Sequence, residues 1–101
     1  MAYILQMDFT HTGPFGEEMT AAFSDLTKSI NEENGFLWKI WTENAQTNEA
    51  GGIYAFETKE DAEKYLAKHL KRLSGFGVKN VNAKIFDINT SLTEINNGPL
   101  K

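Results

Sequence analysis

The sequence contains no cysteine and no long apolar run, and it has no excess of positive charge. The lack of cysteine excludes disulfide bonds, thiolate metal sites and cysteine nucleophiles. No stretch is long enough to cross a membrane as a helix. The N-terminus has no basic leader, and its apolar run breaks at Gln6 and Asp8, so it does not resemble a signal peptide. We therefore expect a cytoplasmic protein that does not engage membranes.

The net charge of −4 disfavours nonspecific binding to nucleic acid, which depends on cations that meet phosphates. A local basic cluster is nevertheless formed by Lys64, Lys68, Lys71 and Arg72. We interpret it as the late part of a helix, where cations complement the helix dipole, with a phosphate site as the alternative.

Motifs for phosphate loops, dinucleotide binding, nucleophile elbows and serine-histidine-aspartate triads are also lacking. The two histidines, His11 and His69, stand in neither a His-x-x-x-His nor a Glu-x-x-His spacing. We therefore expect no metal site.

Apolar periodicity predicts four strands, over residues 2–9, 36–44, 51–57 and 78–88. It also predicts a helix over 16–31 and a second helix that begins after Thr58, in a sequence like a capping box, and stops at Ser74-Gly75. Gly51-Gly52 indicates a bulge or a close backbone approach. The tail, residues 89–101, is compatible with a short turn of helix or with packing on a neighbouring chain.

This order of elements, βαββαβ, is the ferredoxin-like pattern of the α+β class. At 101 residues the chain is long enough for one domain, over residues 1–101. Right-handed crossovers place both helices on one face of a four-stranded antiparallel sheet.

The predicted hairpin is apolar on both faces, although two helices can cover only one. Strand alternation points Phe36, Trp38 and Ile40 to one side, and Leu37 and Trp41 to the other. Contiguous exposed apolar patches are rare unless they are used. We therefore expect a homodimer in which two copies pair through this sheet face.

His69 and the aromatic residues are the strongest site candidates. His69 lies on the apolar stripe of the second helix, where it is either a buried histidine with a satisfied hydrogen bond or a general base near neutral pH. Trp38 and Trp41 face opposite sides of their strand, so one of them can line a pocket instead of only packing in the core. The aromatic residues expected to join it are Tyr54, Tyr65, Phe23 and Phe56.

Several sequence blocks resemble the YdhR-type mono-oxygenases, and the resemblance covers nearly the whole chain. The matching blocks are Gly13-Pro14-Phe15-Gly16, the run from Gly35 to Lys39 with Trp41-Thr42-Glu43, the run from Glu49 to Tyr54, Tyr65-Leu66 with Lys68-His69, and Lys84 with Phe86-Asp87. The resemblance implies a dimeric α+β barrel with a pocket between sheet and helices. That superfamily includes cofactor-free mono-oxygenases of antibiotic biosynthesis. The resemblance assigns no catalytic residue to this chain.

Our main hypothesis is a mono-oxygenase that oxidises a small aromatic or phenolic substrate with molecular oxygen and uses no metal, flavin or haem. His69 and Trp38 are the predicted catalytic residues, and Tyr54, Tyr65, Phe23 and Phe56 the predicted substrate-binding residues. One alternative is a noncatalytic module that binds a small aromatic ligand. Another is haem binding or breakdown, for which a histidine and a tryptophan are available.

Overall fold

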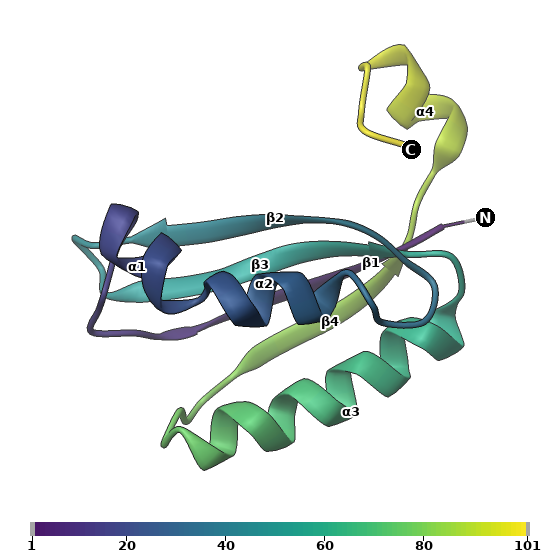
Figure 1. Ribbon diagram of the computed structural model, residues 1–101. Helices are drawn as coiled ribbons and strands as arrows, with labels where there is room; N and C mark the ends of the chain where they lie inside the picture. Colours follow the sequence, from purple (N-terminus) through teal and green to yellow (C-terminus); the bar gives the residue numbers. More distant parts are fainter. Residues whose placement is uncertain (1, 101) are drawn as a thin grey trace.

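The computed structural model describes residues 2–100, which form an antiparallel four-stranded sheet in the order β2-β3-β1-β4. Its elements are β1 (Tyr3–Thr10), α1 (Gly16–Ala22), α2 (Ser24–Ile30), β2 (Phe36–Asn44), β3 (Glu49–Phe56), α3 (Lys59–Gly75), β4 (Asn82–Asp87) and α4 (Thr90–Ile95). The helices α1, α2 and α3 lie on one face of the sheet (Figure 1). We call this the inner face and the opposite one the outer face. The ferredoxin-like α+β fold predicted from the sequence is confirmed.

The first helical segment is interrupted, so the prediction of one helix over 16–31 is wrong. Phe23 has φ −107° and ψ 15°, and it ends α1 and precedes α2. Hydrogen bonding continues through the break, because the Phe23 amide donates to the Met19 carbonyl at 3.0 Å. The break coincides with stacking of the Phe23 ring on Trp41, at 6.1 Å between centroids and 14° between planes. Helical periodicity carries no information about such a contact with a distant strand.

The strand β2 contains an irregularity that the alternation pattern did not predict. Phe36 pairs with Phe56, whereas Trp38 pairs with Ala55, so the register shifts between them. Phe36 therefore joins the inner face, where its ring meets Phe56 edge-on at 5.9 Å. The expectation that Phe36 and Trp38 share a face is wrong, because a bulge restarts the alternation.

Helix α3 begins where the sequence predicts. The Thr58 side chain accepts a hydrogen bond from the Asp61 amide at 3.0 Å, which satisfies one free N–H at the helix start. Two of the cluster's lysines form ion pairs, Lys64 with Glu60 at 3.1 Å and Lys68 with Glu33 at 2.6 Å. The second pair joins α3 to the turn that follows α2.

The core lies between the inner face and the helices. Its fully buried side chains include Leu5 from β1, Tyr54 and Phe56 from β3, and Tyr65 from α3. The outer face remains open to solvent in the single chain, where Ile40 is 49 % and Phe86 48 % exposed.

The tail adopts the short helix α4, one of the two possibilities open from the sequence. The Asn89 side chain caps it by accepting from the Leu92 amide at 3.0 Å. This helix stands away from the sheet, on the side of the N-terminus (Figure 1). Across residues 2–100, no helix combines the length and apolar character needed to cross a membrane.

Two adjacent glycines in β3 permit the close approach expected from their sequence. Gly51 pairs with Asp8, and a Cβ atom added there would overlap the Met7 carbonyl oxygen and approach the Asp8 Cα to 2.8 Å. The bulge considered as an alternative occurs in β2 instead. Backbone atoms of a central strand pair have little freedom to move, so glycine is required at this position.

Replacing Gly51 with alanine should therefore lower the free energy of unfolding by at least about 2 kcal/mol, because β1 and β3 must separate locally. Gly75→Ala is the matched control, since no atom lies within 4 Å of its added Cβ at the end of α3. That substitution should stabilise the protein by up to about 1 kcal/mol through helix propensity. Denaturant titration of both variants measures the difference, and equal stabilities would contradict the proposed clash.

Candidate functional site

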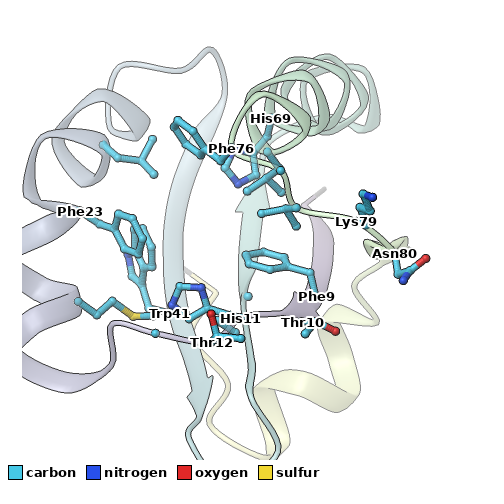
Figure 2. Close-up of a pocket in the computed structure, with 18 of the residues that line it drawn as sticks. Phe9, Thr10, His11, Thr12, Phe23, Trp41, His69, Phe76, Lys79 and Asn80 are labelled. Carbon is cyan, nitrogen blue, oxygen red and sulfur yellow. The ribbon is translucent and has the colours of Figure 1, made fainter.

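A cavity of about 660 Å³ lies over the inner face, between the α1–α2 segment and α3. Figure 2 shows Phe23 and Trp41 on one side, His69 and Phe76 on the other, and His11 at its near end. The segment that follows α3 adds Phe76, Lys79 and Asn80 to the lining. Its volume is typical of small-molecule sites and suits a ligand with a few fused rings.

The structure brings together three of the six residues that the sequence singled out. His69, Tyr54 and Phe23 line the cavity. Phe56 and Tyr65 are buried in the core, 0 % and 2 % exposed, and are not part of the lining. They pack on the lining residues, since the Tyr65 hydroxyl donates to that of Tyr54 at 3.4 Å. Their predicted role in substrate binding can therefore be only indirect in this arrangement.

Trp38 does not share the cavity with His69. Its pairing with Ala55, which also pairs with Ile4, places it on the outer face, where it borders a small hollow beside Pro99 and Leu100. Trp41 occupies the inner face and lines the cavity. The three-residue separation predicts opposite faces for the two tryptophans, but only tertiary structure assigns one to the cavity.

Lys39 also lines the cavity, although the sequence did not single it out as a site residue. Its ammonium nitrogen lies 3.2 Å from the centroid of the Trp41 ring and 4.4 Å from that of Tyr54. Burial, and to a lesser extent the positive charge of Arg72, lowers the pKa of Lys39 from 10.5 to about 7. The alternation of Lys39 with Trp41 along an apolar strand was the available signal, since it puts both on one face.

His69 is buried at 4 % exposure, and its ring stacks on Tyr65 at 5.2 Å. Its Nδ1 accepts from Arg72, at 3.2 Å from Nε and 3.0 Å from Nη2. Desolvation, then the charges of Arg72 and Lys39, lowers the pKa of His69 to about 3. A guanidinium only donates, so the neutral imidazole keeps its proton on Nε2. This arrangement favours a hydrogen-bond donor over the general base expected from the sequence.

The tyrosine hydroxyls near the cavity are neutral groups at physiological pH. Burial raises the pKa of Tyr54, and the neighbouring Tyr65 raises it further. Burial also raises the pKa of Tyr65, against smaller opposing effects from Tyr54 and Arg72. Neither phenol can therefore act as a base at neutral pH.

No carboxylate lines the cavity within residues 2–100, although the whole chain has a net charge of −4. Its titratable lining groups are Lys39, Lys79, His11, His69 and Tyr54. Glu43, which precedes the turn between β2 and β3, instead accepts from the Gly16 amide at 2.8 Å and holds the start of α1. The cavity therefore suits a neutral or anionic ligand.

His11 also lines the cavity, where its Nε2 lies 2.8 Å from the Pro14 carbonyl oxygen. Its ring contacts Phe15 edge-on at 5.3 Å, so it belongs to the aromatic rim of the cavity. Over the described part of the chain, no three His, Asp or Glu side chains lie close enough to hold a metal ion.

Comparisons with known proteins agree with this architecture. The family model described as "Putative mono-oxygenase ydhR" matches residues 4–99. Two solved structures share the fold: a variant of SnoaB, a cofactor-independent oxygenase from Streptomyces nogalater, and a "putative antibiotic biosynthesis monooxygenase" from Deinococcus radiodurans. The first has 14 % identity and a TM-score of 0.62, covering 87 % of this chain and 93 % of its own. The second has 11 % identity and a TM-score of 0.57, covering 88 % and 93 %. No curated protein matches the chain.

The buried amine gives stability a pH dependence that can be measured. Lys39 has a folded-state pKa of about 7 against 10.5 in the unfolded chain, so the unfolded state binds more protons between these values. The amine therefore lowers the free energy of unfolding most at or below pH 7, and this destabilisation disappears as the pH rises to 10.5.

We expect Lys39→Met to stabilise the protein by on the order of a few kcal/mol near pH 7, with the gain shrinking towards pH 10.5. Denaturation midpoints across this range measure the gain. Lys71→Met, at an exposed position on α3, is the control and should show no such trend. A gain that does not change with pH would contradict the buried, unpaired amine.

Proposed function

The chain belongs to the family described as "Putative mono-oxygenase ydhR", and from this we propose that it oxidises a small aromatic, phenol-like substrate with molecular oxygen and without metal, flavin or haem. The observation that carries the proposal is the cavity itself, which combines flat aromatic walls with buried polar groups that favour a negative charge. Fold likeness alone would not suffice, because one fold serves many activities.

The walls of the cavity support a planar substrate. Trp41 and Phe23 stack on each other, and Tyr54 lies across from them on the next strand. Flat apolar surfaces bind aromatic rings and exclude water from the reacting atoms. A substrate of two or three fused rings suits the volume of about 660 Å³.

In this reaction the substrate supplies the electrons. A base removes a proton from the acidic phenol or activated methylene, and the resulting anion reduces oxygen and forms a carbon–oxygen bond. A methylene group and O2 are converted into a carbonyl group and water, so atoms and electrons balance. The protein must stabilise the anion, and the N–H of His69 is a donor suited to that role.

We also propose that the protein is a homodimer that pairs through the outer face. Support comes from the apolar side chains left open there, Ile40 and Phe86, with Trp38 and Ile53 on the same face. Burial of such a patch against a second copy removes it from water. In this arrangement Trp38 would lie at the interface, and its predicted catalytic role remains a prediction.

Purified protein should consume oxygen with anthrone faster than buffer does, and label from 18O2 should appear in the carbonyl product. His69→Ala and Trp41→Ala should each reduce the rate at least about tenfold, through loss of a donor and of a wall. Leu92→Ala on the exposed α4 is the control. Thermal unfolding of each variant verifies its fold.

Trp38→Ala in the same assay tests the catalytic role that the sequence assigned to Trp38. If a broad set of phenols raises the melting temperature of the protein but yields no oxidised product, the result would support the noncatalytic binding module and refute the oxygenase. A Soret shift on haem titration would support the haem alternative.

Light scattering should report about twice the mass of one chain for the wild type. Phe86→Asp and Ile40→Asp place charges on the outer face and should give monomers, because a buried unpaired carboxylate opposes association. Ala67→Asp, on the exposed surface of α3, should leave the dimer intact. A folded wild-type monomer at micromolar concentration would refute pairing through this face.

A further inference from the structure

The proposed reaction needs a base, and the cavity offers few groups able to act as one. His69 has its Nδ1 occupied by Arg72, and the Tyr54 phenol is neutral. Lys79 lies at the exposed rim. Lys39 projects from the middle of β2 over the cavity floor, with its nitrogen against the Trp41 ring. None of the carboxylates in residues 2–100 forms an ion pair with it.

We propose that Lys39 is the general base of the cavity and that the substrate is an acidic phenol, whose proton the neutral amine accepts. This inference rests on the proposed function and names its substrate class and its base. The phenolic O–H bond breaks and an N–H bond forms on Lys39, and no electron is transferred in this step. The ammonium ion then holds the phenolate, the electron-rich species that reacts with oxygen.

The groups that face Lys39 favour this proton transfer. Arg72 and His69 approach from α3, Tyr54 from β3, and Tyr65 lies behind Tyr54. Of these groups only Arg72 carries a positive charge that opposes protonation of Lys39. The faces of the Trp41 and Tyr54 rings favour the ammonium ion once the proton has been transferred, and no carboxylate lines the cavity within residues 2–100 to repel an anion beside it. A pKa near 7 leaves the amine largely unprotonated in a slightly alkaline solution.

An acidic phenol fits these charges better than a carboxylic acid does. A neutral phenol and a neutral amine can meet in the apolar cavity without burying a charge, and the ion pair forms only after contact. A carboxylate is already charged at neutral pH, so its entry requires desolvation of an ion before any pairing. The aromatic walls also match a planar ring.

Gly52 positions Lys39. It lies on the inner face of β3, opposite Trp41, and an added Cβ would come within 2.6 Å of the Lys39 Cε. The missing side chain therefore makes the space in which the lysine lies flat against the two rings. Gly52→Ala keeps the amine in the protein but moves it, which makes this variant a test of position separate from charge.

The test uses 4-nitrophenol, an acidic phenol whose ionised form absorbs visible light, and needs no turnover. Titration without oxygen, at a pH where the free phenol is about half ionised, should give a larger phenolate fraction with the wild-type protein than in buffer. Lys39→Met should lower the bound phenolate signal at least about tenfold, because it removes the proton acceptor. Gly52→Ala should also lower it, and Lys84→Met, on the outer face, should not.

Lys39→Arg separates proton transfer from simple charge attraction. The wild type should bind 4-nitrophenol best near neutral pH, with weaker binding when amine and phenol have both lost their protons. Arginine keeps its charge throughout, so its binding should rise with pH and stay high. Three results would overturn the proposal: binding by the wild type that rises with pH as in Lys39→Arg, a bound ligand with the spectrum of the un-ionised phenol, or no binding at all.

Oxygen uptake with anthrone, which has a phenolic tautomer, distinguishes this inference from the proposed function. Loss of uptake in Lys39→Met, in a protein that remains folded, is the expected result. Uptake that persists there would refute Lys39 as the base and leave the oxygenase standing. Ionisation of 4-nitrophenol by a wild type that consumes no oxygen would refute the oxygenase and leave Lys39 as a base.

Discussion

The close pairing of β1 with β3 at two adjacent glycines is the constraint on which the site depends. Gly51 lets the backbone of β1 approach, because any Cβ there would overlap the Met7 carbonyl oxygen. Gly52, one residue later, faces the opposite side and leaves room for Lys39. One short segment therefore holds the centre of the sheet together and shapes the floor of the cavity above it.

The second determinant is desolvation. Burial takes an amine and an imidazole partly out of water, no carboxylate of residues 2–100 pairs with either, and the charge of Arg72 adds to the effect. Both groups therefore favour their neutral forms at or above neutral pH. A neutral amine and a neutral N–H donor side by side are suited to accepting a proton and holding the resulting anion, which is the chemistry that we propose.

Much of the fold could be predicted from the sequence, because strand alternation and helix periodicity are local properties. The capped start of α3 and the last strand's alternation both appear in the structure, although β4 begins at Asn82 instead of 78. Predictions failed where a contact between residues far apart in the sequence determines the local structure. The break at Phe23 coincides with its stacking on Trp41, and the shift between Phe36 and Trp38 depends on pairing with β3.

The sequence by itself determined the class of fold, the apolar excess on the sheet, and the presence of His69 on the inward stripe of its helix. These features follow from residue order, since periodicity sets which side chains share a face. Tertiary structure alone decided that Trp41 and not Trp38 lines the cavity, and that Lys39 lies there without an ion pair to any carboxylate of residues 2–100. Burial and charge balance arise from elements far apart in the chain, so no local pattern reports them.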